Sequence, residues 1–443
     1  MKAVHQKLTK YISFNMLGTA GLSCYILADT YFVAKGLGSN GLAALNIALP
    51  IYNLIYGVGM MIGMGAATRF SLEKSSRKTA GADLFTQAFY LVLFFGLIFV
   101  CLGLFANRQI TALFQANEEV FSMTQTYLTV VLLFAPFFLM NHLLLAFIRN
   151  DGSPNLAMAG MLSSSLANTI CDYIFIFPCG MGMLGAVLAT GLSPIFSMAV
   201  LSVHFIRKKN QFRLYRLRPK WERMKTLLAL GVSSLVTEFS NGIVILVFNT
   251  LLLGMLGNLG VAAYGVLANI ALVILAIFTG ISQGMQPIVS QSRGAGRWDE
   301  VTDGYRFCLV LSLLIALFIY VFCVFFQEPI IMAFNEEKNL DLLSIASEGL
   351  VVYFIGFLFA GANIITCVYF SAIGVAQASF LLSLLRGLLL IVPLAILLSM
   401  VFGVLGVWLA FPVTEGITFL VAIACYRWER KKTAALWRSF QSK

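Results

Sequence analysis

Twelve apolar segments, each long enough to cross a lipid bilayer as a helix, follow one another along almost the whole chain. A membrane-spanning helix needs roughly 20 apolar residues. The segments cover residues 11–34, 42–66, 84–106, 120–146, 156–178, 182–206, 227–252, 260–289, 304–326, 346–372, 378–400 and 404–426. A transmembrane barrel would show shorter segments of alternating polarity instead. The pattern therefore predicts an all-α integral membrane protein with twelve transmembrane helices.

The low content of charged residues also indicates a membrane protein. Only 11% of the 443 residues are charged and 60% are hydrophobic, whereas a soluble domain carries roughly 25% charged residues. So few charges cannot cover a water-facing surface. This excludes most soluble enzyme folds, nucleic-acid-binding modules and disordered scaffolds, and it makes the lipid bilayer the expected partner.

The basic residues predict the orientation of the spans. If the N-terminus lies inside, 26 of the 30 Lys and Arg residues fall in cytoplasmic segments, among them Arg149 at the end of span four, and three fall outside. Such an excess is the positive-inside signal. It accounts for the net charge of +11 without a nucleic-acid partner. We expect a multi-pass protein of the plasma membrane with both termini in the cytoplasm.

The second half of the chain resembles the first. The matching pairs are Leu37–Ala44 with Leu256–Ala263, Asn141 and Gly152 with Asn363 and Gly374, and Gly182–Ala189 with Gly403–Ala410, at offsets of 219, 222 and 221. Because six is an even number of spans, the two halves enter the membrane in the same orientation. Transporters with such repeats bind substrate between the halves and rock one against the other.

The repeat and the longest polar stretch together predict the domain organisation. We expect an N-terminal six-helix lobe at 1–206, a basic cytoplasmic linker at 207–226, a C-terminal six-helix lobe at 227–426 and a basic cytoplasmic tail at 427–443.

A charged side chain inside a membrane is costly, so each one is a candidate for function. Counted from the outer ends of spans one, five and six, Asp29, Asn168, Asp172 and Thr190 share one level of the N-terminal lobe. Their oxygens suit a hard cation such as Na⁺, and two close carboxylates also suit protons. The alternative is a polar network that locks these spans together, although two acids without a basic partner make a costly lock.

The C-terminal lobe holds the other charges of the spans. Glu238 lies near the membrane centre, where a pair with Arg386 would lower the cost of both; Arg386 could instead extend to the cytoplasmic interface. Glu415 lies in the middle of span twelve, and its role stays open between structure and function. At an offset of 221, Asn168 and Asp172 correspond to Leu389 and Pro393, so the principal cation site is expected in the N-terminal lobe.

The methionines of span two, Met60, Met61 and Met64, allow two interpretations. Methionine can form the pliable wall of an apolar cavity, but packing against lipid is the commoner role for such residues.

Several of these residues match one family. The chain resembles the multidrug and toxic compound extrusion (MATE) family over nearly its whole length. The resemblance is carried by Asp29-Thr30, Asn168-x-x-x-Asp172, Gly185–Thr190, Gln283–Pro287, Gly294–Gly296 and Glu238. Some members have an aspartate in span ten, where this chain offers Asn363.

The resemblance implies a secondary antiporter that exports amphipathic, often cationic, organic compounds in exchange for Na⁺ or H⁺. It implies Asp29, Asn168, Asp172 and Thr190 as the cation site, and Glu238, Arg386, Gln283, Asn363 and Glu415 as candidates for a substrate or proton site in the C-terminal lobe. We expect no enzyme activity, no cofactor beyond the coupling ion, and a monomer. A lipid or oligosaccharide flippase of the same superfamily is the alternative, but it would need a more cationic cavity than Arg386 provides.

Overall fold

A computed structural model describes residues 2–74, 80–114, 118–335 and 339–441. These residues form helices joined by short connections, with no strand among them. Ten of the helices are long and apolar enough to cross a membrane. The first, α1 (Lys2–Glu73), is long enough to cross twice, because 72 helical residues would extend about 108 Å. Non-helical Gly38 divides it, and α5 (Pro154–Ile176) completes the twelve predicted spans.

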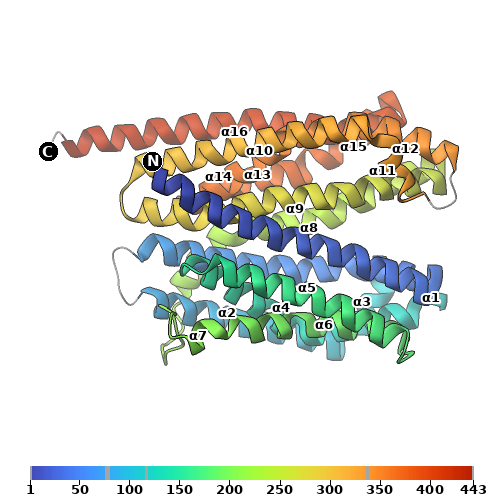
Figure 1. Cartoon of the computed structure of the whole chain (residues 1–443), viewed down its shortest axis with the longest axis horizontal. Helices are drawn as coiled ribbons and strands as arrows, with labels where there is room; N and C mark the ends of the chain where they lie inside the picture. Colours follow the sequence, from blue (N-terminus) through green and yellow to red (C-terminus); the bar gives the residue numbers. More distant parts are fainter. Residues whose placement is uncertain (1, 75–79, 115–117, 336–338, 442–443) are drawn as a thin grey trace.

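The two lobes contain corresponding helices. The N-terminal lobe consists of α1, α2 (Ala80–Phe105), α3 (Asn107–Leu113), α4 (Glu118–Asn150), α5, α6 (Gly182–Leu201) and α7 (Val203–Ile206). The C-terminal lobe consists of α8 (Trp221–Leu256), α9 (Asn258–Gly294), α10 (Trp298–Phe325), α11 (Gln327–Met332), α12 (Leu340–Tyr353), η1 (Phe354–Gly356), α13 (Phe357–Ala372), α14 (Ala376–Leu384), η2 (Leu385–Leu389), α15 (Ile391–Phe402) and α16 (Val404–Gln441). In Figure 1 the first half of α1 crosses between α2 to α6 and α9 to α16.

The internal repeat seen in the sequence recurs in the backbone. Within each of three pairs of glycines the two positive φ angles are nearly equal. The pairs are Gly38 and Gly257 (69° and 63°), Gly152 and Gly374 (92° and 89°), and Gly182 and Gly403 (59° and 61°). Glycine adopts these angles without steric cost. The members of each pair are separated by the same offsets as the matching sequence segments. The helices of both lobes are therefore connected by the same kinds of turn, as a parallel repeat requires.

The start of α1 and the end of α16 lie at the same end of the bundle as residues 207–220, the non-helical connection between the lobes (left in Figure 1). We call this the linker end. The connection follows α2 of the N-terminal lobe: Tyr215 N donates to Thr86 Oγ1 at 3.1 Å, and the Tyr90 hydroxyl donates to Leu217 O at 2.7 Å. The Phe212 side chain is fully buried. The connection is thus part of the packing of the N-terminal lobe.

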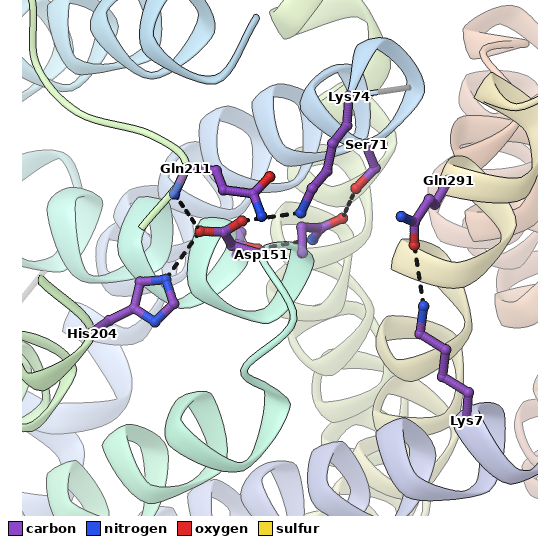
Figure 2. Close-up of polar contacts among 9 residues, drawn as sticks. Lys7, Ser71, Lys74, Asp151, His204, Gln211 and Gln291 are labelled. Atoms are coloured by element: carbon purple, nitrogen blue, oxygen red, sulfur yellow. Dashed lines mark hydrogen bonds and ion pairs between the residues drawn. The ribbon is translucent and has the colours of Figure 1, made fainter. Parts of the chain in front are cut away.

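Asp151, just after α4, fixes the start of this connection. Its buried carboxylate lies 3.0 Å from Lys74 Nζ and 3.1 Å from His204 Nε2, and it accepts a hydrogen bond from Gln211 N at 2.8 Å. Figure 2 shows these partners converging on Asp151 from three segments of the chain. A carboxylate buried among a cation, an imidazole and a backbone amide has its hydrogen-bonding capacity met, so burial is tolerated here.

Candidate functional site

Two acidic side chains meet inside the N-terminal lobe. Asp29 comes from the first half of α1 and Asp172 from α5, and these helices pack together. Their carboxyl groups lie within hydrogen-bonding distance of each other. The exposed fraction is 8% for Asp29 and zero for Asp172. The acids that the sequence placed at one level are therefore neighbours in space.

Asn168 and Thr190 complete the predicted group. Asn168 lies one helical turn before Asp172, and its Nδ2 is 3.4 Å from Thr190 Oγ1 on α6. With the Asn168 amide turned over, its nitrogen donates to Asp172 Oδ2 at 2.9 Å and its oxygen accepts from Thr190 N at 3.3 Å. Both residues are buried. We call Asp29, Asn168, Asp172 and Thr190 the acidic cluster.

Sequence reasoning missed one member of this neighbourhood, Tyr127 on α4. Its buried side chain lies close to Thr190 and within electrostatic range of Asp29 and Asp172. No motif in the sequence connects Tyr127 to the acids, because its position depends on how α4 packs against α6.

The charge of the acidic cluster is not balanced. Asp29 Oδ1 and Asp172 Oδ1 are buried and have no hydrogen-bond partner, and no ion pair joins either acid to a basic side chain of the described residues. A buried carboxylate is costly unless it is paired or neutralised. Oxygen atoms in this arrangement can accept a proton or a monovalent cation. Within the described ranges no three His, Cys, Asp or Glu side chains are grouped as a conventional metal site.

The C-terminal lobe holds a different kind of charged group. Arg386 contacts Glu415 Oε1 through Nη2 at 2.7 Å and Nε at 3.1 Å, and Asn363 Nδ2 donates to Glu415 Oε2 at 2.6 Å. The suggested Glu238–Arg386 pair is therefore wrong, and so is the extension of Arg386 to the interface. Glu415, to which sequence reasoning gave no role, is the counter-ion. This acid carries its own cation, unlike the acidic cluster.

The π-helical turn η2 explains why this pairing was not foreseen. Arg386 lies within η2, where hydrogen bonds span one residue more than in an α-helix and the side chains after the turn change face. Counting along the sequence gives a residue's depth but not its direction. Glu238 lies apart on α8, half-buried and packed against Gly57 of α1.

Gln283, the last candidate of the C-terminal lobe, belongs to the boundary between the lobes. Its Oε1 accepts a hydrogen bond from Arg149 Nη1 on α4 at 2.5 Å. The same Arg149 nitrogen donates to Asn15 Oδ1 at 2.9 Å. Sequence reasoning counted Arg149 as a cytoplasmic charge, whereas its exposed fraction is 3%.

Further contacts extend this seam at the linker end. Gln286 of α9 accepts from Asn150 Nδ2 at 3.0 Å and donates to Thr68 Oγ1 at 2.9 Å, while Lys7 Nζ donates to Gln291 Oε1 at 3.2 Å (Figure 2). We call these contacts, with those of Arg149, the polar seam. The glycines of α8 and α9 that pack against α1 lie in the same half of the bundle. The lobes are therefore closed against each other at the linker end.

A cavity lies beside the polar seam. It is lined by residues of both lobes, namely Leu22, Tyr56, Met60, Met64, His142, Leu145, Ala146, Arg149, Met161 and Gln283. Met61 and Met64 are buried, at 6% and 5% exposure. The interpretation of the span-two methionines as lipid-facing is therefore wrong, and Met60 and Met64 form part of a cavity wall.

Two like six-helix lobes that meet along a polar seam, with unpaired acids inside one of them, are typical of a membrane transporter built from a parallel repeat. The profile of the MatE family matches residues 16–174 and 234–411. The chain belongs to the MATE family, whose members are transporters and not enzymes. The predicted fold class is thereby confirmed.

Individual relatives agree with this assignment. The chain is 26% identical over 424 residues to "Multidrug export protein MepA" of Staphylococcus saprophyticus, covering 92% of this chain and 90% of the relative. The protein of the same name from Staphylococcus aureus strain MSSA476 is 26% identical over 420 residues, with the same coverage.

Solved structures show the same fold. "Crystal structure of MATE in complex with MaL6" superimposes with a TM-score of 0.91 at 21% identity, over 98% of this chain and 97% of the other. "Outward-facing conformation of a multidrug resistance MATE family transporter of the MOP superfamily" gives 0.89 at 22% identity, over 98% and 96%.

Proposed function

We propose that the protein is a cation-coupled antiporter that exports amphipathic, often cationic, drugs or toxic organic compounds. Its relatives named for multidrug export support the substrate class. The observation that supports coupling is the pair of buried carboxylates, Asp29 and Asp172, with unpartnered oxygens. Such a pair favours the entry of a positive charge, and either Na⁺ or H⁺ supplies it.

The acidic cluster would couple ion binding to movement through α1. Asp29 lies on the first half of α1, and the same half-helix carries Lys7 and Asn15, which belong to the polar seam. A cation at Asp29 and Asp172 would draw α1 toward α5 and change its contacts with α9. In this scheme, ion binding favours the release of substrate on one side of the membrane and the reopening of the transporter on the other side, as a rocker-switch mechanism requires.

The closed linker end fits the orientation expected from the basic residues. With the termini in the cytoplasm of a plasma-membrane protein, the closed end of the described state would face the cytoplasm. Inward movement of one monovalent cation then releases about 2.3 kcal/mol per 100 mV of membrane potential, in addition to its concentration gradient. We expect the unit of transport to be one chain, because both lobes of the seam come from the same polypeptide.

The flippase alternative is less well supported. Arg386, the cation on which it would rely, is neutralised by Glu415 at 2.7 Å. A phosphate-bearing lipid headgroup needs basic groups free to contact it, and the lining of the cavity beside the polar seam offers a single one, Arg149.

Dye efflux from proteoliposomes tests the proposal. The purified protein is reconstituted, and a cationic dye is followed while a Na⁺ or an H⁺ gradient is imposed separately. We expect one of the two gradients to drive efflux, and Asp172→Asn to reduce it to the leak rate while the protein stays folded. Asp341→Asn, an exposed acid of α12, serves as the matched control. Wild-type efflux by Asp172→Asn, or no response to either gradient, would refute the coupling proposal.

A further inference from the structure

Arg149 is a buried cation without an anion. Its exposed fraction is 3%, and no ion pair joins it to an Asp or Glu of the described residues. Both hydrogen bonds to oxygen come from Nη1 and end on neutral amides, Asn15 and Gln283. A buried guanidinium normally faces a carboxylate or phosphate, because desolvation of the charge is otherwise uncompensated.

One edge of the guanidinium is free of oxygen partners. Arg149 Nε is buried and has no hydrogen-bond partner, and the described contact of Nη2 is Met64 Sδ at 3.1 Å, a weak acceptor. Nε and Nη2 carry two parallel N–H bonds, the geometry in which arginine binds a carboxylate through both oxygens. Contacts that hold the two lobes together use Nη1 only. They do not explain why the Nε and Nη2 edge of the buried guanidinium lacks an oxygen partner.

Arg149 lines a cavity of only about 20 Å³, so a ligand can reach the free edge of the guanidinium only after the lobes separate. Arg149 lines the cavity beside the polar seam together with Tyr56, Met60 and His142. Tyr56 is within electrostatic range of Arg149 and also of Glu238 on α8, and Glu238 has no ion pair among the described residues. Arg149 and Glu238 are thus two opposite charges without an ion-pair partner among the described residues, and Tyr56 lies within electrostatic range of both.

We propose that Arg149 binds the carboxylate of zwitterionic amphipathic substrates, whose cationic part is directed toward Glu238. The aromatic and methionine walls contact the apolar body of the substrate, and methionine adapts to different shapes. The proposal rests on the proposed export function and specifies its substrate class. Purely cationic substrates would use the Glu238 side of the same region and would not need Arg149.

Rhodamine B and its ethyl ester provide a matched pair of probes. Rhodamine B carries a cationic xanthene and a free carboxylate, whereas the ester retains the cation and loses the anion. Equilibrium binding of both dyes to the purified full-length protein is measured by fluorescence polarisation, and their efflux is measured in proteoliposomes. We expect Arg149→Gln to weaken the binding of rhodamine B about tenfold or more, with a much smaller change for the ester.

A latch variant separates binding from closure of the seam. Gln283→Leu removes one of the two oxygen acceptors of Arg149 but keeps the guanidinium in place. It should change the binding of both dyes by a similar factor, because it alters the polar seam and leaves the charge of Arg149 in place. Arg149→Lys restores a positive charge without the planar fork, so it should recover part of the preference for rhodamine B.

Competition on the wild-type protein gives a test that needs no variant. Benzoate should displace rhodamine B and leave the ester bound, while the neutral analogue benzamide should displace neither. Equal losses for both dyes in Arg149→Gln, or equal displacement by benzoate and benzamide, would overturn the proposal. If neither dye is exported although both bind with the expected preference, the proposed export function fails and the carboxylate site stands.

Discussion

Gly231 of α8 provides a way to change the balance between the two orientations of the lobes. A Cβ atom at this position would overlap the Met61 carbonyl oxygen and lie 2.6 Å from the Met61 carbonyl carbon, whereas ordinary contacts are 3.4–4 Å. The obstacle is backbone of α1 in the other lobe, so no side-chain rotation can relieve it. Gly231→Ala therefore requires α1 and α8 to separate by about 1 Å or more, because the Met61 carbonyl carbon would lie 0.8 Å inside the shortest ordinary contact and the carbonyl oxygen would lie closer still.

The expected size of the effect follows from overpacking. An extra methyl group in a tightly packed interface costs about 1–3 kcal/mol, and here the cost applies to the state in which the lobes are closed at the linker end. Such a free-energy difference changes a two-state equilibrium by roughly 5- to 150-fold. Alanine also favours the helix itself by about 0.8–1.0 kcal/mol, so an effect on folding should be small or stabilising.

Distances between spin labels measure this equilibrium. Exposed residues at the linker end, Asn155 on α5 and Asp299 on α10, are replaced by labelled cysteines after the accessible native cysteines have been removed. We expect Gly231→Ala to increase the population with a longer distance. Gly254→Ala lies on the same helix, has nothing within 4 Å of the added Cβ, and gains the same helix propensity. Identical distance distributions in wild type, Gly231→Ala and Gly254→Ala would refute the reasoning.

Two further predictions concern stability. Arg386→Met should lower the free energy of unfolding by about 3–5 kcal/mol, because it leaves Glu415 buried without its cation. The double variant with Glu415→Leu should recover most of this loss. Thermal unfolding in detergent measures both effects, and no recovery in the double variant would contradict the pairing. Phe212→Ala should lower the melting temperature clearly, with a cost of about 3–5 kcal/mol for a buried aromatic, whereas Leu214→Ala, at 51% exposure, should change it little. Equal shifts for these two would show that the connection between the lobes is not anchored by Phe212.

The features that sequence reasoning predicted correctly are those fixed by length and periodicity. Apolar segments of sufficient length gave the twelve spans, and the repeat offsets recur in pairs such as Gly182 and Gly403, with φ of 59° and 61°. Asp29 and Asp172 could be placed side by side because each occurs at a countable depth in a regular helix.

The features that were missed depend on the face of the helix to which a side chain points and on packing between the lobes. The partner of Arg386 is determined by the wide turn η2, which changes the face that the helix presents. Arg149 occurs at the end of a span, where sequence alone does not separate a solvated cation from a buried one. Its burial results from α9, which follows more than a hundred residues later and brings Gln283 against it.

The difference between the two lobes follows from how each balances its acids. The repeat gives both lobes the same turns, but Glu415 is paired with Arg386 at 2.7 Å, whereas no basic side chain of the described residues is paired with Asp29 or Asp172. Under the proposed mechanism the N-terminal lobe therefore changes its charge during the cycle, and the C-terminal lobe does not. A transport cycle in which only the N-terminal lobe changes its charge needs contacts between the lobes that can break and form again. The neutral amides Asn15 and Gln283 suit that surface, since their bonds with Arg149 are weaker than those of a buried carboxylate pair.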